Sequence, residues 1–246
     1  MIDPMNTSTD EYAQAPIILG IEMSNPSANS GTGSDAGNAV ALWSSDEGAP
    51  RLLGSCPMPK GARGSDGIMS VIAGCCGEHG VVPESIGTII VSIGPGGYTA
   101  LRIATTTAKV LASTLGARLL PVPTARVAAC AAAAQTRPLL VALASKKDHT
   151  HASIVDGSGH ERSVGVITAE DLESLGVRAM ACDQHLPDSI RERAEQLGIE
   201  LLQLTLDATA LLAASSGIDP VEPRQLAPRY AREPDAVTQW RARKGG

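Results

Sequence analysis

The chain has 246 residues, of which 43% are hydrophobic and 19% are charged, and its formal net charge is −6 at pH 7. This length and composition are typical of one globular domain or two small lobes. The negative charge gives no basic footprint for nucleic acid and argues against direct, tight RNA binding by the chain alone. Because the chain has two Trp, three Tyr and no Phe, its core must be built from Ala, Val, Ile and Leu.

The cysteines and the N-terminal segment indicate a reducing compartment. The five cysteines form no C-x-x-C pair, which argues against a disulfide framework and against a zinc knuckle, and we expect reduced, mostly buried thiols. Residues 1–15 are polar and acidic, without the pattern of a secretory signal, and predict a flexible extension. No apolar run reaches the roughly 18 residues of a membrane span. We therefore expect a cytoplasmic protein without membrane contact.

In chain order, the first half predicts three strands, a helix, a strand and a helix. The strands are expected at apolar stretches at residues 17–22, 38–44, 51–56 and 88–92. The helices are expected at residues 66–79 and 99–115. A low-complexity Gly/Ser/Asn loop at residues 25–37 separates the first two strands.

The second half repeats this alternation. Strands are expected at residues 118–122, 139–145, 151–155, 164–167, near 179 and at 200–204, and helices at 124–134, 169–175, 187–197 and 208–216. Four prolines beyond residue 219 predict an extended tail. The fold class is therefore α/β, with two lobes of mixed sheets flanked by helices. We divide the chain into the extension 1–15, a first lobe 16–118, a smaller second lobe 119–226 and a Pro-rich tail 227–246.

A Gly/Pro corner joins the strand that ends at Ser92 to the helix that follows. Pro95 fixes one φ angle, while glycines permit backbone angles or close approaches that a β-carbon would forbid. The residues that we assign to this corner are Gly94, Pro95, Gly96, Gly97, Tyr98, Thr99 and Arg102. Tight packing against this corner is expected.

Three motifs in the same order carry a family resemblance. They are ILGIEMSNP at 18–26, GPGGYTALR at 94–102 and PRYAREPDAVTQW at 228–240. With them the chain resembles the bacterial TsaB (YeaZ) family of the actin-like ATPase superfamily. Met23, the Gly97-Tyr98 pair and Ala100 depart from the family pattern.

The resemblance implies both an architecture and a role. It implies two actin-like (RNase H-like) lobes and a non-catalytic subunit of the machinery that makes N6-threonylcarbamoyladenosine (t6A) at position 37 of tRNA. The implied partners are a TsaD-type catalytic paralogue and, through it, a TsaE-type ATPase, so that contact with tRNA is indirect. No cofactor is required for such a role. A self-associating regulatory homodimer is an alternative.

Glu22 and Ser24 occupy the places where catalytic actin-like ATPases hold Mg²⁺ and wrap phosphate. One interpretation is a weak or interface-shared site for ATP or ADP with Mg²⁺. With such a site, the alternative function is that of a small actin-like ATPase or phosphotransferase. The other is a relic, in which Glu22 is held by hydrogen bonds. We favour the relic, because a Gly-rich loop without a second phosphate motif is weak support for nucleotide binding.

The helix at 99–115 carries two apolar stripes on nearly opposite faces. One stripe must pack on the helix's own sheet, and the other on a neighbouring element, within the lobe or in another subunit. The resemblance implies a subunit interface with the TsaD-type paralogue or a second copy. The interface residues that we expect are Leu101, Ala104, Thr107, Ala108, Leu111 and Ala112. For Arg102 we expect a carboxylate partner, since a cation in the first turn is opposed by the helix dipole.

The sequence offers no pattern for catalysis. The histidines at 79, 149, 151, 160 and 185 form no H-x-x-x-H pair, and no G-x-S-x-G segment is present. His149 and His151 face the same way on a strand, but no third ligand lies near them in sequence. We therefore predict no metal site, no catalytic residue and no protease activity.

Overall fold

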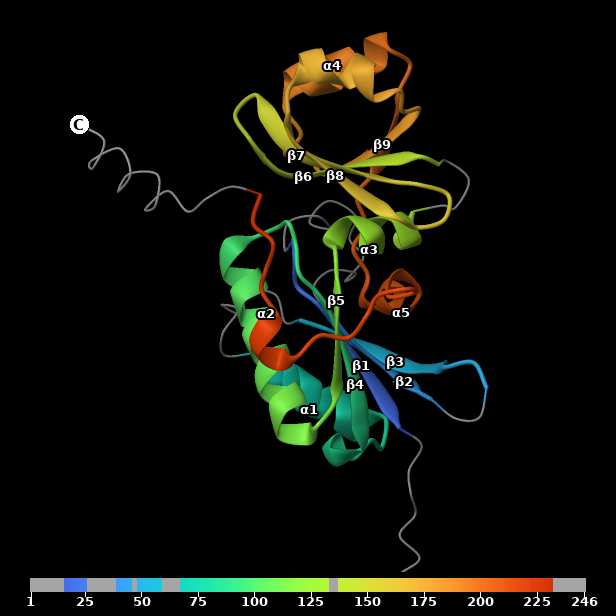
Figure 1. The fold of residues 1–246 in the computed structure, drawn as a ribbon, viewed down its shortest axis with the longest axis vertical. Coiled ribbons are helices and arrows are strands. Elements are labelled where there is room, and N and C mark those ends of the chain that lie inside the picture. Colours follow the sequence, from blue (N-terminus) through green and yellow to red (C-terminus); the bar gives the residue numbers. More distant parts are fainter. Residues whose placement is uncertain (1–15, 26–38, 46–47, 59–66, 133–136, 232–246) are drawn as a thin grey trace, which may run out of the picture.

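The computed structural model describes residues 16–25, 39–45, 48–58, 67–132 and 137–231. Within them the chain forms two five-stranded sheets, one above the other, with helices outside and between them (Figure 1). The expected α/β class with two lobes of mixed sheets is confirmed.

The first sheet contains β1 (Ile17–Glu22), β2 (Ala39–Ser44), β3 (Arg51–Pro57), β4 (Ile86–Ser92) and β5 (Arg118–Val122). Its strand order is β3-β2-β1-β4-β5. The β1–β2 and β2–β3 pairs are antiparallel, whereas β1–β4 and β4–β5 are parallel. Since β5 pairs with β4, the first sheet extends past residue 118, where the sequence placed the end of the first lobe.

The second sheet repeats the same plan. It contains β6 (Leu139–Lys146), β7 (His149–Val155), β8 (Glu161–Ile167), β9 (Ala179–Cys182) and β10 (Glu200–Gln203). The strand order is β10-β9-β6-β7-β8, with an antiparallel β6-β7-β8 meander extended by parallel β9 and β10. The repetition seen in the sequence is therefore a repetition of topology.

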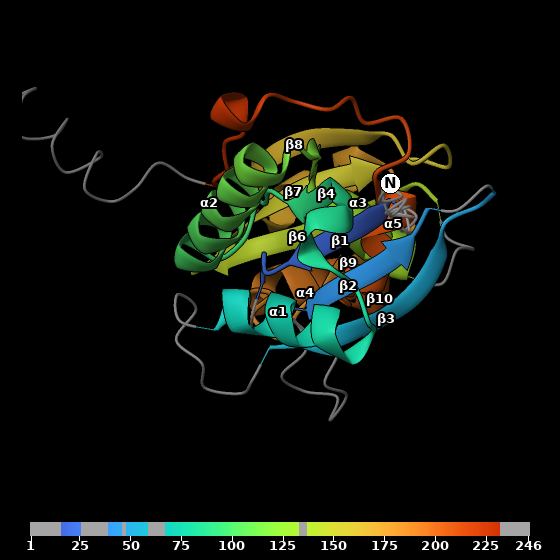
Figure 2. The ribbon, with the colours of Figure 1, turned by 90° about the horizontal axis from the view of Figure 1, so that it is seen from below.

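Helices form layers around the sheets. The helices α1 (Ile68–Glu78) and α2 (Tyr98–Leu115) cover the outer face of the first sheet, and α4 (Asp188–Gln196) covers the second, together with the 3₁₀ segment η2 (Ala169–Leu175) (Figures 1 and 2). Between the sheets lie α3 (Thr124–Ala131) and α5 (Leu211–Ala214).

Three further 3₁₀ segments are η1 (Pro83–Ser85), η3 (Ala208–Ala210) and η4 (Pro223–Gln225). Two sequence predictions are corrected here: residues 169–175 form a 3₁₀ helix, and residues 208–216 divide into η3 and the short α5. The Asp207 side chain begins η3 by accepting a hydrogen bond from the Thr209 amide, at 2.8 Å. Side-chain capping of this kind satisfies a backbone amide that has no partner within the first turn.

The alternating side chains of β1 join two of the three hydrophobic clusters. Ile17, Leu19 and Ile21 pack toward α1 and α2, whereas Ile18 faces the layer that contains α3 and α5. Because both faces are covered, β1 is apolar up to Ile21, as expected for an inner strand, and only its last residue, Glu22, is polar. The middle cluster includes side chains of both sheets, so the two lobes share a core.

Among the described residues, no helix combines the length and the apolar character needed to cross a membrane.

Candidate functional site

The Gly/Pro corner is the point at which four parts of the chain meet. It follows β4 and leads into α2, whose first residue is Tyr98. The Gly94 carbonyl accepts a hydrogen bond from the Thr124 amide at 3.0 Å, just after β5, and the Ile93 carbonyl accepts one from the Arg229 amide of the tail at 2.6 Å. The Gly97 amide donates to the Ser24 carbonyl, just after β1, at 2.6 Å. The corner therefore fixes the ends of β1 and β5 and the tail relative to α2.

Two glycines permit these approaches. A β-carbon on Gly96 would lie 1.9 Å from the Ser24 carbonyl oxygen, and one on Gly94 would lie 2.3 Å from that of Arg229. Gly94 also has a φ of +101°, a conformation that disfavours any residue with a β-carbon. The expected tight packing is confirmed, and the packed groups include backbone atoms of Ser24, just after β1, and of Arg229 in the tail.

Aromatic side chains cover the start of α2. The Tyr98 and Tyr230 rings lie 4.8 Å apart at an interplanar angle of 31°, and the Arg102 guanidinium lies 5.4 Å from the Tyr98 ring centroid. Arg102 also donates a hydrogen bond to the Tyr98 hydroxyl, at 3.2 Å. Among the described residues, Arg102 thus interacts with Tyr98, whereas the sequence predicted a carboxylate partner. Thr99 is exposed beside it.

Glu22 is fully buried at the end of β1. Its Oε1 atom accepts hydrogen bonds from the Ser24 amide at 2.7 Å and the Ser24 hydroxyl at 2.6 Å. Burial raises the pKa of the Glu22 carboxyl, although the bonds from Ser24 act in the opposite direction. The hydroxyl of Ser92, on the neighbouring strand, also acts to lower this pKa.

This arrangement does not fit a Mg²⁺ site in the conformation described. Mg²⁺ usually keeps several of its waters, whereas Glu22 and Ser24 are both 0% exposed and have no contact with solvent. One carboxylate oxygen is already used within the chain. The geometry therefore favours the relic interpretation over a phosphate site.

The end of β1 also reaches the second lobe. The Asn25 side chain donates a hydrogen bond to the carboxylate of Asp183, just after β9, at 3.1 Å, and both residues are nearly buried. Asp183 also accepts a hydrogen bond from the His185 amide at 2.9 Å. No sequence motif indicated this link, because its two residues are far apart in the chain and neither belongs to a local pattern.

The small-residue stripe of α2 faces inward, which corrects part of the expected interface. Four of the six residues are at most 2% exposed and lie in the core of the first lobe, namely Leu101, Ala104, Ala108 and Ala112. Thr107 and Leu111 are half-buried, and Leu111 packs against the same core. The four buried side chains cannot contact a partner on this fold.

The outer surface of α2 is adjacent to that of α1. Val110 is 58% exposed on α2, and Met69 is 52% exposed on α1. The two helices pack on the same core beneath these residues. We define the α1–α2 face as seven exposed residues of the two helices, which are Met69, Ser70, Ala73, Gly74, Thr106, Val110 and Ser113. The exposed side of α1 was not expected from the sequence, although the small residues Ala73 and Gly74 were a usable signal.

Comparison with known proteins decides the family. The sequence model of the TsaD family, described as tRNA N6-adenosine threonylcarbamoyltransferase, matches residues 51–176, slightly more than half of the chain. The chain belongs to the TsaD family. The family match thus associates the chain with the proteins of t6A synthesis. No curated protein matches the sequence.

Solved structures show the same fold over nearly the whole chain. YeaZ from Pseudomonas aeruginosa superposes with a TM-score of 0.64 at 21% identity, covering 87% of this chain and 99% of that one. An uncharacterized protein with similarity to peptidase YeaZ, also from Pseudomonas aeruginosa, gives a TM-score of 0.62 at 18% identity, covering 88% and 100%. The family match and this YeaZ fold together confirm the resemblance to TsaB (YeaZ) that the three motifs indicated.

Proposed function

We propose that this chain is a non-catalytic partner subunit of the t6A37 synthesis complex, and that it docks on a TsaD-type catalytic subunit and activates it. The observation that carries the proposal is the α1–α2 face, an exposed helical surface with apolar centres at Met69 and Val110. In this role the chain fixes the partner's geometry, and the partner performs the transfer to adenosine 37.

The composition of the α1–α2 face suits another helical surface. α1 has no charged residue before Glu78, and α2 has only Arg102 and Lys109. Ala, Gly, Ser and Thr at the remaining positions allow close approach of a partner's backbone. Charge depletion around an apolar centre is typical of the buried part of protein interfaces. The expected interface is therefore moved from the buried alanines to the opposite side of the same helix.

The polar groups of the chain support a role without chemistry. The sequence has no H-x-x-x-H pair, which the catalytic paralogue has, and no nucleophile motif. The acidic residue of the first strand, Glu22, accepts two hydrogen bonds from Ser24 of the same chain. In this proposal the TsaE-type ATPase and tRNA join through the TsaD-type subunit, and the chain needs no nucleotide of its own.

Co-purification with a TsaD-type subunit and reconstitution of t6A on tRNA test the proposal. We expect the Val110→Arg variant to fold normally, to lose the complex and to reduce t6A formation. Val166→Arg is the matched control, because Val166 is 51% exposed on β8 in the other lobe. Full t6A modification of tRNA in the absence of this chain would refute the proposal. Equal binding of the TsaD-type subunit by both variants would show that the interface is not the α1–α2 face.

The homodimer alternative uses the same face and is separated by light scattering. We expect addition of the TsaD-type subunit to give a heterodimer whether or not the chain associates with itself. A homodimer that persists unchanged in the presence of the TsaD-type subunit, with no heterodimer formed, would contradict docking and support the regulatory homodimer.

A further inference from the structure

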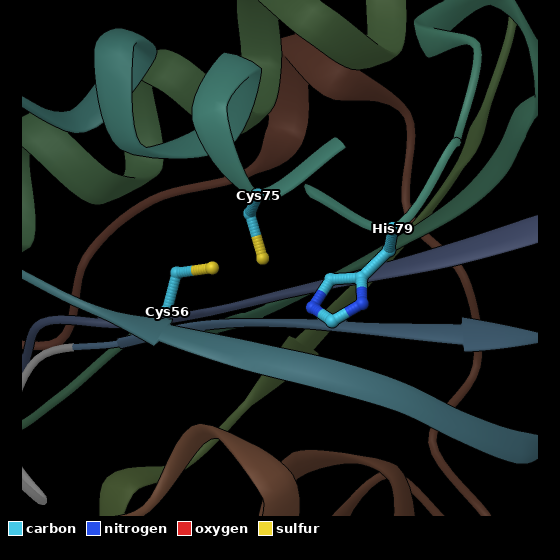
Figure 3. A group of neighbouring side chains, drawn as sticks. All are labelled: Cys56, Cys75 and His79. Carbon is cyan, nitrogen blue, oxygen red and sulfur yellow. The ribbon is translucent and has the colours of Figure 1, made fainter. Parts of the chain in front are cut away.

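Three side chains that are separated in the sequence converge between β3 and α1. Cys56 lies on β3, Cys75 lies in the last turns of α1, and His79 is the residue that ends α1. One ligand atom from each lies within 4.8 Å of the other two. Figure 3 shows the two sulfur atoms pointing toward each other, with the imidazole ring turned toward the same space.

We propose that Cys56, Cys75 and His79 form a structural zinc site that joins the edge strand β3 to the C-terminal end of α1. Two sulfurs and one imidazole nitrogen are a ligand set typical of Zn²⁺, and sulfur is a poor ligand for Mg²⁺ or Ca²⁺. This inference concerns a different part of the chain from Glu22 and does not depend on the docking role.

The distances suit a site that needs only small side-chain movements. With Zn–S bonds of about 2.3 Å and a Zn–N bond of about 2.0 Å, tetrahedral geometry places the two sulfurs about 3.8 Å apart and each sulfur about 3.5 Å from the nitrogen. The observed upper limit of 4.8 Å exceeds these separations by about 1 Å. Cys75 and His79 are four residues apart, so they lie on one side of the helix end.

A candidate for the fourth ligand contacts one member of the cluster. The Cys56 thiol donates a hydrogen bond to Oε2 of Glu78 at 3.5 Å, which places that carboxylate at the edge of the cluster. A carboxylate is an accepted zinc ligand, so rotation of the Glu78 side chain toward the cluster, or a water molecule, would supply the fourth ligand. Binding of Zn²⁺ forms two Zn–S bonds and releases the two thiol protons to solvent.

Accessibility and local packing also agree with a metal site. Cys75 is 1% exposed and Cys56 is 9% exposed, whereas His79 is exposed at the surface, so an ion can enter from the histidine side. Gly54 on β3 leaves room for the imidazole, because a β-carbon there would lie 2.2 Å from its Nε2 atom. The glycine thus allows the ring to lie over the strand near the sulfurs.

Titration of the reduced, metal-free chain with Co²⁺ and then Zn²⁺ tests the proposal. We expect one equivalent of Co²⁺ to give thiolate-to-cobalt charge-transfer absorption and the visible bands of a tetrahedral ion, and Zn²⁺ to remove both. Cys56→Ser and Cys75→Ser should each lose part of the charge-transfer band and weaken zinc binding roughly a hundredfold or more, since a ligand contributes at least as much as the outer-shell groups that orient it. Cys130→Ser and His160→Ala, at exposed positions outside the cluster, should bind as the unaltered chain does.

Two further variants keep the test independent of folding. His79→Ala changes an exposed residue at a helix end, and Gly54→Ala keeps every ligand but displaces the ring, so both should weaken zinc binding in chains that remain folded. Zinc should also raise the melting temperature of the unaltered chain and not that of Cys75→Ser. Absence of a charge-transfer band, or equal loss in Cys130→Ser and Cys75→Ser, would overturn the proposal. A Cys56–Cys75 disulfide with no cobalt band after reduction would likewise overturn it.

Discussion

The carbonyl oxygen of Ser24 lies where a side chain on Gly96 would have to be. An ideal β-carbon at Gly96 would be 1.9 Å from that oxygen, and the adjacent amide of Gly97 donates a hydrogen bond to it at 2.6 Å. The end of β1 and the start of α2 are therefore joined through backbone atoms, at a position where only glycine fits.

The first prediction concerns this contact. Gly96→Ala should lower the free energy of unfolding by about 2 kcal/mol or more, because two backbone segments must separate to admit the methyl group. Gly74→Ala is the matched control: a β-carbon there meets nothing within 4 Å. In an exposed helix interior this change should stabilise the chain by roughly 1 kcal/mol. Urea denaturation of both variants measures their free energies of unfolding. Equal values for the two variants would mean that the corner moves enough to admit the methyl group.

The second prediction separates the two faces of α2. Ala104→Arg should destabilise the first lobe by about 3 kcal/mol or more, since it places a charge in the core without a partner. Val110→Arg should change the free energy of unfolding by less than about 0.5 kcal/mol, as substitutions at exposed positions usually do. Chemical denaturation of the isolated chain measures both values. A stable Ala104→Arg variant would show that the alanine stripe is not buried.

The third prediction is a pH dependence caused by Glu22. Burial raises its pKa above the ordinary value of 4.5, so the folded chain holds this proton more tightly than the unfolded chain does. Protonation of Glu22 therefore contributes to the stability of the folded chain. This contribution is fully present below the unfolded-state pKa of Glu22 and is lost as pH rises through its folded-state pKa. Relative to Glu22→Gln, the unaltered chain should therefore lose stability as pH rises from about 4.5.

Denaturant unfolding at a series of pH values, from below this pKa to neutral, measures that difference. Comparison with Glu22→Gln cancels the contributions of the other titrating groups. A difference that does not vary with pH would mean that Glu22 titrates alike in the folded and unfolded chains.

The fourth prediction concerns the tail. Tyr230 packs on Tyr98 at a ring distance of 4.8 Å, so a double-mutant cycle with alanine at both positions should give a coupling free energy of about 0.5 to 1.5 kcal/mol. The cycle of Tyr98 with Val110, which lies about 18 Å further along α2, is the control and should be additive within about 0.5 kcal/mol. Additivity of the Tyr98–Tyr230 pair would show that the stack does not hold the tail in solution.

Local patterns predicted the elements well where both local geometry and burial act in the same direction. The strand at 17–22 and the strand at 118–122 coincide with β1 and β5, and the helix at 99–115 begins one residue earlier, at Tyr98. The helix expected at 208–216 begins beside the Asp207 cap but is divided into η3 and the short α5. Hydrophobic periodicity alone carries no information about such a cap.

The candidate site was predicted less completely. The motif at 94–102 located the corner and its close packing, but not the groups packed against it, since Ser24 and Arg229 approach through backbone atoms that any residue possesses. The two apolar stripes of α2 were visible, yet four of the six residues expected at an interface are buried in the core of the first lobe. Ala104 and Ala108 are small, and small residues suit both a tight core and a close helix pair.

The Gly/Pro corner and the repeated strand–helix pattern were determined by the sequence itself, because φ restrictions and side-chain periodicity act over a few neighbouring residues. Only the tertiary structure decided which face of α2 is buried and which groups donate hydrogen bonds to the Glu22 carboxylate. It also decided where Cys56 meets Cys75 and His79. These relationships depend on the register of β3 beside β2 and on the packing of α1 across the sheet. Both are set by contacts between segments far apart in the chain, which no local pattern records.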